Sequence, residues 1–192
     1  PAKRKNGRKP TENTVEVIAI YTSVLNFAPL APRAGYNGAG FPWFRCKRFR
    51  MSASSYPLEG VTVLDFGQIY NGPYASFMLA MAGARVIKIE PPHGEPLRRR
   101  TAADGGSVPL AILNANKEGI TLNLKHQRGR ELLHKMVMRA DVLLENFAPT
   151  VMDRLGVGPD SLMALNPALI YASSSGYGRE GPRRDDLAMD LT

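Results

Sequence analysis

The 192-residue chain has one cysteine and only three histidines. A lone thiol, Cys46, excludes a disulfide framework and a cysteine-based zinc site. The histidines, His93, His126 and His134, show no metal-ligand spacing. Surface or structural roles are therefore favoured for all three, and the sequence predicts no bound metal.

The sequence also lacks an apolar run suited to crossing a membrane. An uncharged run from Val17 to Pro32 is sixteen residues long and contains Thr22, Ser23 and Asn26. A membrane-spanning helix needs about 20 predominantly apolar residues. This run is too short and too polar, and we expect no membrane association.

Acidic residues are scarce in the first fifty positions. Residues 1–50 carry ten Lys or Arg against Glu12 and Glu16, which accounts for the whole net charge of +8. Residues 51–192 hold fifteen basic and fifteen acidic residues. Because non-specific phosphate binding requires basic charge gathered on a folded face, the neutral body is not expected to bind nucleic acid.

The basic first segment differs from the rest of the chain. It is open to three interpretations: a secretory signal, an organelle-targeting leader, or an extension upstream of the true start. Met51 and the serine-rich residues after it resemble an ordinary polar beginning, which favours the third. We therefore divide the chain into a basic, disordered extension at residues 1–56 and a folded domain at 57–192.

From Leu58 onward, apolar or β-branched runs alternate with helix-like segments. This order predicts right-handed crossovers and a mainly parallel sheet with helices on both faces, a Rossmann-like α/β fold. Pro73 suits a first helical turn, and Gly83 suits a helix end. The expected strands are 61–66, 85–90, 120–124, 141–145 and 169–173, and the expected helices are 74–81, 109–114, 128–140, 151–155 and 160–165.

The end of the fourth expected strand carries polar and aromatic residues, Glu145-Asn146-Phe147, followed by Arg154. Ligands of such sheets bind beyond the carboxyl ends of the strands. Asn146 offers two donors and an acceptor, Phe147 a stacking face, and Arg154 a bidentate contact to phosphate, which suits a nucleotide-bearing cofactor. In the structural alternative, which this chemistry leaves equally open, Asn146 caps the next turn, Phe147 is core and Arg154 is solvated.

Residues 176–181 spell G-x-G-x-x-G. A dinucleotide-binding fingerprint opens a helix early in a βαβ unit. This motif instead follows the last expected strand and continues into Pro182-Arg183-Arg184, which is a poor helix start. We interpret it as a glycine loop and not as a nicotinamide site.

From about Pro57 to Thr192 the chain resembles the amino-terminal portion of the family III coenzyme A transferases, which include the α-methylacyl-CoA racemases. No single motif carries this resemblance, but their order and spacing do. The motifs are PLEGVTVLDF followed by GP, GARVIKIEPP, NANK, GITLNLK, ADVLLENFAP with DRLG, and NPALIYASSSGYGREGP.

The resemblance implies a CoA-binding Rossmann-like large domain in a homodimer of interlocked chains. It implies a cytoplasmic enzyme, or a mitochondrial one if the basic segment is a transit peptide. The reaction would move CoA from an acyl-CoA to a carboxylate through an aspartyl-CoA thioester, a covalent route that retains the thioester's energy. The implied CoA contacts are the loop residues Ile69, Tyr70 and Asn71, and Asn146, Phe147 and Arg154.

The chain departs from the family pattern at three places. Tyr70 stands where many members have glutamine. Glu118 follows Asn116-Lys117 here, whereas many members have an arginine after the Asn-Lys pair. Pro91-Pro92 replaces a basic residue found in some relatives, and Arg98, the first of three arginines, is expected to substitute for it.

The family's nucleophilic aspartate is expected beyond Thr192, so the chain is predicted to be incomplete and inactive in transfer. Asp190 lies near an acid/base aspartate of the racemases, although Met189 replaces their histidine. The alternatives are thus a racemase-type isomerase that uses Asp190, and a non-catalytic truncated CoA-binding module. A surface or capping aspartate is the favoured interpretation of Asp190.

Overall fold

The computed structural model describes residues 56–99, 107–186 and 188. The extension predicted for residues 1–56, apart from its last residue, and the acid/base candidate Asp190 lie outside the described residues. The elements are β1 (Thr62–Asp65), α1 (Asn71–Met81), β2 (Arg85–Glu90), the 3₁₀ helix η1 (Pro96–Arg99), α2 (Val108–Leu113), β3 (Glu118–Thr121), α3 (Gln127–Val137), β4 (Val142–Glu145), α4 (Val151–Arg154), α5 (Pro159–Leu165) and β5 (Ile170–Ser173).

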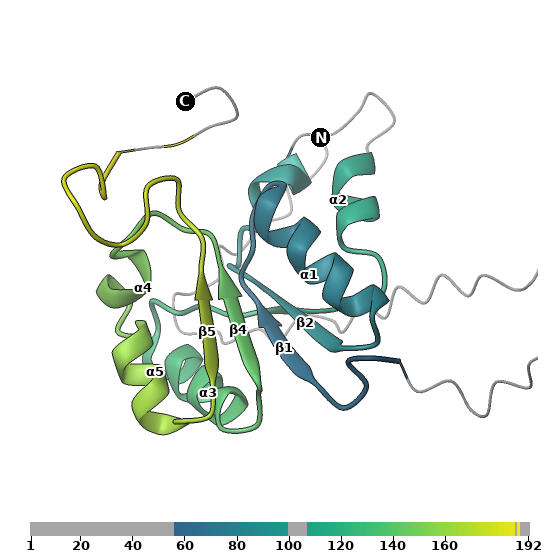
Figure 1. Ribbon diagram of the computed structural model, residues 1–192, viewed down its shortest axis with the longest axis horizontal. Helices are drawn as coiled ribbons and strands as arrows, with labels where there is room; N and C mark the ends of the chain where they lie inside the picture. The colour runs from purple at the N-terminus through teal and green to yellow at the C-terminus, as the bar shows by residue number, and fades with distance from the viewer. Residues whose placement is uncertain (1–55, 100–106, 187, 189–192) are drawn as a thin grey trace, which may run out of the picture.

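The strands form one parallel sheet in the order β3-β2-β1-β4-β5 (Figure 1). The first strand, β1, is the central one; β2 and β3 follow it toward one edge, and β4 and β5 lie on the other side of β1. This order confirms the predicted α/β class. It also places the topological switch point, where ligands of such sheets bind, between β1 and β4.

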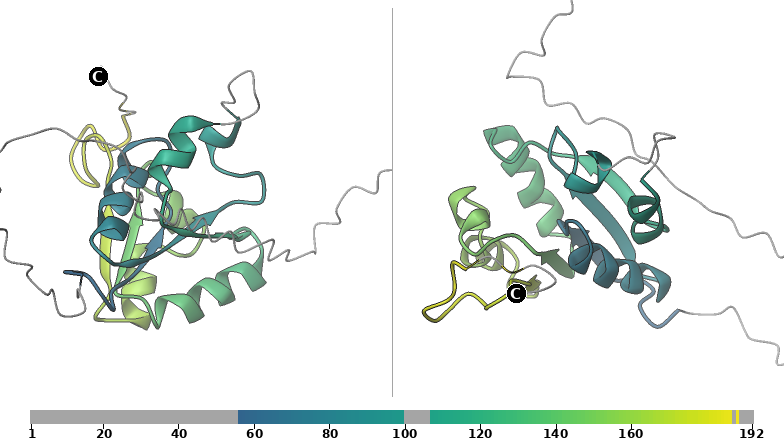
Figure 2. Two further views of the ribbon diagram at one scale, coloured as in Figure 1. Left: turned by 90° about the vertical axis from the view of Figure 1, so that its right-hand side faces the viewer. Right: turned by 90° about the horizontal axis from the view of Figure 1, so that it is seen from above.

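Successive residues of the central strands face opposite sides of the sheet. Val63 and Val86 pack with Ala80 of α1 on one side, whereas Leu64 packs with Leu133 of α3 on the other. The two sides are seen in Figure 2, where α1 and α3 lie on opposite faces of the strands. Both faces are therefore covered, which explains why the strands are apolar over most of their length.

The third strand begins and ends earlier than the predicted range 120–124. β3 pairs with β2 from Ile87↔Glu118 to Glu90↔Thr121, so regular pairing stops where β2 reaches Pro91. The Leu122 N–H still donates to the Glu90 carbonyl at 2.8 Å, after which the chain turns. The apolar alternation of residues 120–124 thus reflects burial that continues beyond the strand.

Two helices differ from their predicted limits by three residues at one end, and the other three differ by no more than one residue at either end. α1 begins at Asn71 and not at residue 74, so Pro73 lies within its first turn, and Gly83 follows its end with φ +99°. α3 ends at Val137 and not at residue 140. The Arg139 and Ala140 N–H groups donate three residues back, which tightens the chain into a turn.

Leu133 is fully buried between α3 and the sheet. We expect Leu133→Ala to lower the free energy of unfolding by about 2–5 kcal/mol through lost burial and the cavity left behind. Met138→Ala, at an exposed position just after the same helix, should change it by less than about 0.5 kcal/mol. Urea unfolding of both variants measures the difference, and equal effects would contradict this packing.

Candidate functional site

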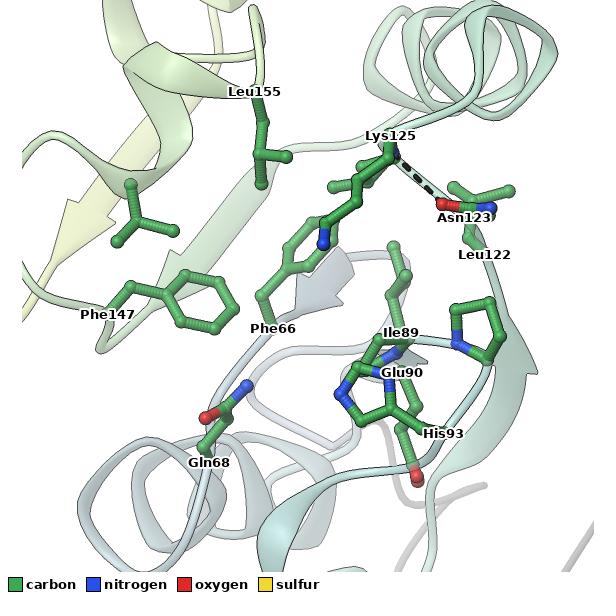
Figure 3. Close-up of a pocket in the computed structure, with 14 residues that line it drawn as sticks. Phe66, Gln68, Ile89, Glu90, His93, Leu122, Asn123, Lys125, Phe147 and Leu155 are labelled. Carbon is green, nitrogen blue, oxygen red and sulfur yellow. Dashed lines mark hydrogen bonds between the residues drawn. The ribbon is translucent and has the colours of Figure 1, made fainter. Parts of the chain in front are cut away.

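A cleft of about 370 Å³ opens at the carboxyl ends of β1, β2 and β3, beside the loop that follows β4 (Figure 3). Its walls are mainly apolar, and the side chains of Gln68, His93 and Lys125 point toward the same space. The cleft is lined by Phe66, Gln68, Ile89, Glu90, Pro91, Pro92, His93, Leu122, Asn123, Leu124, Lys125, Phe147, Val151 and Leu155.

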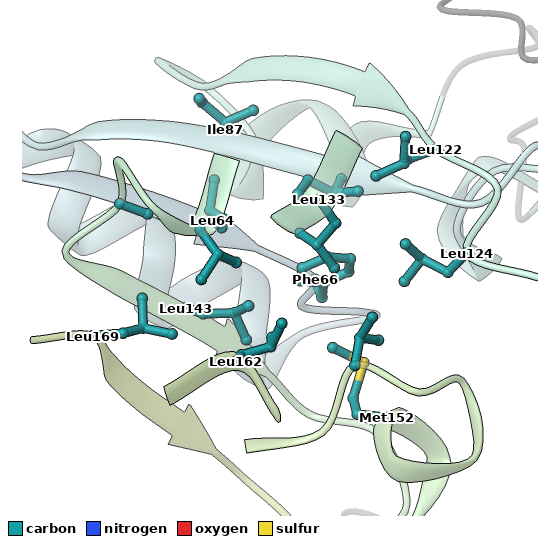
Figure 4. Packing of buried hydrophobic residues seen from close by; sticks show 14 residues of the cluster. Leu64, Phe66, Ile87, Leu122, Leu124, Leu133, Leu143, Met152, Leu162 and Leu169 are labelled. Atoms are coloured by element: carbon teal, nitrogen blue, oxygen red, sulfur yellow. The ribbon is translucent and has the colours of Figure 1, made fainter. Parts of the chain in front are cut away.

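The floor of the cleft belongs to the main hydrophobic core. Phe66, Leu122 and Leu124 line the cleft and also pack in the cluster around Leu133 (Figure 4). Because these side chains are fixed by the core, the apolar wall is preformed. An apolar cleft with a few converging polar groups is the usual form of a small-molecule site.

Phe147 lies where the sequence placed it, at the edge of the cleft. Its side chain is half-buried, lines the cleft and packs against the core cluster. Phe147 therefore contributes to the core and also presents a surface to the cleft, and its stacking against a ligand stays a prediction.

The Asn146 carboxamide is engaged within the protein. Its Oδ1 accepts from the Gln68 N–H at 2.7 Å, and its Nδ2 donates to the Gln68 carbonyl at 3.0 Å. This pair of bonds joins the loop after β4 to the loop after β1. Asn146 does not cap the following helix, since the N-cap of α4 is Thr150.

Residues Ile69, Tyr70 and Asn71 continue the same loop but do not line the cleft. Ile69 has φ +62° and donates its N–H to Glu95 Oε2 at 3.0 Å. Tyr70 is exposed, and the Asn71 Nδ2 donates to Ser174 Oγ at 3.3 Å. Asn71 thereby contacts the segment that follows β5, whereas Ile69 contacts the segment before η1.

The two predicted arginines lie outside the cleft lining. Arg98, on η1, makes a bidentate ion pair with Glu90, at 2.5 Å from Nε to Oε2 and 2.7 Å from Nη2 to Oε1. Arg154 is exposed on α4, between Val151 and Leu155, which both line the cleft. The structure thus brings Asn146 and Phe147 to the loop after β1 and leaves both arginines at the margin.

Buried charges lie under the loop between β1 and α1. Lys117 Nζ donates to Asp65 Oδ2 at 3.0 Å, to Ser76 Oγ at 2.8 Å and to the Pro73 carbonyl at 2.9 Å. Ser76 in turn donates to Asp65 Oδ2 at 2.6 Å. Burial lowers the pKa of Lys117 to about 8, and the Asp65 carboxylate offsets only part of that effect.

Glu90 is a second buried carboxylate at this edge. Desolvation opposes its ionisation, but the bonds from Arg98 and the Glu95 N–H, with the charges of Arg98 and Lys88, outweigh it. The pKa of Glu90 is therefore lowered from its ordinary value of 4.5. Glu90 stays ionised at neutral pH and fixes η1 beside the cleft.

Two groups of residues here were not predicted from the sequence. The polar cleft residues Gln68, Asn123 and Lys125 have no common motif, and only the fold brings them together. The charged layer had a signal: Lys88 and Glu90 alternate with isoleucines in a strand expected to be covered on both faces. A charge in such a strand must be paired or hydrogen-bonded. Glu90 pairs with Arg98, and Lys88 donates to the Gly67 carbonyl.

The glycine motif at residues 176–181 lies in an irregular segment after β5, and no helix begins there within the described residues. Arg179 from this segment pairs with Asp153 of α4 at 2.7 Å. The motif therefore lacks the helix of a dinucleotide fingerprint, as the sequence indicated.

The described part of the chain contains neither a cluster of metal ligands nor a membrane-spanning helix. Over residues 56–99 and 107–186, no three His, Cys, Asp or Glu side chains are grouped so as to hold a metal ion. Over the same residues, every helix is too short or too polar to cross a membrane.

The model of the CoA-transferase family III matches residues 58–192. The chain belongs to this family. The match confirms the resemblance carried by the sequence motifs, and it covers the whole sheet, the cleft and the buried charged layer.

Curated relatives match this CoA-transferase family member over part of their length. The acetyl-CoA:oxalate CoA-transferase of Acetobacter aceti is 48% identical over 136 residues, 70% of this chain and 35% of that protein. The formyl-CoA:oxalate CoA-transferase of Streptomyces coelicolor is 45% identical over 127 residues, 65% of this chain and 31% of that protein. The chain thus spans about a third of the length of these relatives.

Solved structures share the fold. A Mycobacterium tuberculosis protein, Rv3272, superimposes with a TM-score of 0.68 at 39% identity, over 71% of this chain and 38% of that one. A CAIB/BAIF family protein from Brucella suis gives a TM-score of 0.67 at 34% identity, with the same shares covered.

Because its pKa is lowered in the folded protein, ionised Glu90 stabilises the fold, and this stabilisation is lost in acid. Because the folded-state pKa lies below the unfolded value, this contribution is present above about pH 4.5 and is lost as the pH falls through the folded-state pKa. We expect Glu90→Gln to lower the free energy of unfolding by about 1 kcal/mol at pH 7. The difference from the parent chain should shrink below about pH 4.5.

Urea unfolding between pH 3 and 7, roughly the range over which carboxylates titrate, measures this difference. Glu180→Gln, at an exposed position, is the matched control and should follow the parent chain at every pH. A Glu90→Gln difference that stays constant over this range would contradict the assigned pKa direction.

Proposed function

We propose that the cleft binds the adenosine end of coenzyme A, and that the complete protein moves CoA between an acyl-CoA and a carboxylic acid. The observation that carries this proposal is the form of the cleft. It combines a preformed apolar wall with a cationic side chain, Lys125, at the switch point of a parallel sheet. A flat aromatic base against Phe66 and Phe147, with phosphate near Lys125, fits this chemistry.

The relatives support the reaction class. Their names describe transfer of CoA from acetyl-CoA or formyl-CoA to oxalate, and, in Chloroflexus aurantiacus, between succinyl-CoA and D-citramalate. In each name the acceptor is a carboxylic acid. We therefore propose a carboxylate acceptor for the complete protein, with an aspartate forming the intermediate thioester.

In our proposal, the described residues bind CoA but do not carry out the transfer. Phe66 and Phe147 hold the base, Lys125 faces phosphate, and the loop residues Ile69, Tyr70 and Asn71 lie along the path toward the β5 end. Arg98 and Arg154, at the margin of the cleft, would contact the outer phosphates. The isomerase alternative depends on Asp190, which lies outside the described residues, and no described contact favours it.

We further propose that the complete protein is a cytoplasmic homodimer. The exposed side of α1 supports a protein contact, because Tyr74, Met78 and Met81 are each more than half exposed on one stripe of that helix. Sedimentation of the complete protein tests the dimer, and a monomer at micromolar concentration would contradict it.

Calorimetric titration of the 192-residue chain tests the binding site. We expect saturable binding of CoA, weaker binding of adenosine, and none of pantetheine, because the proposed contacts are to the base and the phosphates. Absence of saturable CoA binding, or pantetheine binding as strong as that of CoA, would overturn the assignment.

Lys125→Met removes the cationic side chain from the cleft and keeps its apolar length. We expect the affinity for CoA to fall about tenfold, as for the loss of one charged hydrogen bond, with the affinity for adenosine unchanged. Lys135→Met, on the exposed side of α3, is the control and should bind both ligands as the parent does. Equal losses for CoA and adenosine would show that Lys125 does not meet phosphate.

A further inference from the structure

Two buried lysines hold the two ends of the 67–73 loop, a name used here for the segment after β1 together with the first turn of α1. Lys88 of β2 donates from Nζ to the Gly67 carbonyl at 2.7 Å. Lys117, just before β3, donates to the Pro73 carbonyl at 2.9 Å. Both lysines are at most 5% exposed, so neither bond has water as a ready substitute.

The middle of the loop is held from two other directions. Asn146 makes its two bonds to the Gln68 backbone, and Glu95 accepts the N–H of Ile69 at 3.0 Å. Ile69 has a left-handed backbone with φ +62°, which is unfavourable for a β-branched residue and persists only where the surroundings impose it. The loop therefore keeps its shape through contacts to other elements.

The ends of the loop also touch each other. A methyl group on Gly72 would lie 2.6 Å from the Gly67 Cα and 2.9 Å from Asn146 Oδ1. This approach leaves no room for a side chain at Gly72. Asn146 lies beside Gly72 at this contact, and Lys117 holds the next residue through the Pro73 carbonyl.

Lys117 has no capacity left for a ligand. Its ammonium group has three N–H donors, and four acceptors lie within 3.0 Å: Asp65 Oδ2, Ser76 Oγ, the Pro73 carbonyl and Asn114 Oδ1. It is buried and does not line the cleft. A role as a direct ligand contact or as an acid in the cleft is therefore excluded by its geometry.

We propose that Lys117 is a positioning residue for the site: with Asp65 and Ser76 it fixes the 67–73 loop, and so places Gln68 against the cleft. The lysine links α1, the end of β1 and the segment before β3 through one group. That the positioned loop serves CoA binding rests on the function proposed above. The positioning itself does not.

Amide hydrogen exchange tests the positioning directly. In Lys117→Met we expect the Gln68 and Ile69 amides to exchange about tenfold to a hundredfold faster under native conditions, as for loss of a charged hydrogen bond. The Leu64 and Leu143 amides of the core strands should exchange at the same rates as in the parent chain. Unchanged exchange in the loop, or equal acceleration at all four amides, would overturn the proposal.

Lys117→Met leaves the Asp65 carboxylate buried without its cation, which can prevent folding. The double variant Asp65→Asn/Lys117→Met removes both charges and still deprives the Pro73 carbonyl of its donor. It should show the same local acceleration in the loop. Lys135→Met, at an exposed position, is the matched control and should exchange as the parent does.

A second measurement connects the loop to the ligand. We expect CoA to bind the double variant about three- to tenfold more weakly, which is equivalent to losing part of one hydrogen bond. Neither Asp65 nor Lys117 lines the cleft, so this loss would act through the loop. If loop exchange is accelerated but the affinity for CoA is unchanged, the proposal that the fixed loop supports CoA binding is wrong. If the parent chain binds no CoA, the proposed function fails, and the exchange result still decides whether Lys117 fixes the loop.

Discussion

The buried ion pair between Asp65 and Lys117 is the contact on which the cleft-bearing edge of the sheet depends. Removing either charge from water costs several kcal/mol, which only a close partner and further hydrogen bonds offset. Here Ser76, the Pro73 carbonyl and Asn114 supply those bonds. Since these partners belong to different elements, α1 and the segment before β3 cannot separate without unpairing a charge.

Successive side chains of a strand point to opposite faces of the sheet, and the two faces have different roles here. Leu64, Ile87 and Ile89 face α3 and form the apolar core that continues into the cleft floor. Asp65 and Lys88 face α1 and hold the loop above it. The same few strand ends thus provide both a rigid apolar wall and a fixed polar rim, and no separate element is needed for either.

The sequence predicted the sheet and most helices because each apolar run had turn residues at its ends. It predicted the position of Phe147 at the carboxyl edge of the sheet, where the cleft lies, because the rule about carboxyl ends depends only on fold class. It could not assign Asn146, since counting donors does not reveal that they are used on the Gln68 backbone. His93 and Lys125 follow two different strands, and no spacing along the chain indicates that they face one cleft. β3 ends where its partner strand β2 reaches Pro91. This limit is set by the pairing of the two strands and cannot be read from the β3 residues alone.

The loop after β1 has little main-chain hydrogen-bonding capacity left for an anion. The N–H groups of Gly67, Gln68 and Ile69 all donate to side chains of the protein. Glycine-rich loops that cradle phosphates work differently, because there the amides point outward to the ligand. A negatively charged guest in this cleft must consequently be neutralised by the ammonium or guanidinium groups of side chains. Its retention is then sensitive to ionic strength and open to change by single surface substitutions, while the scaffold below stays the same.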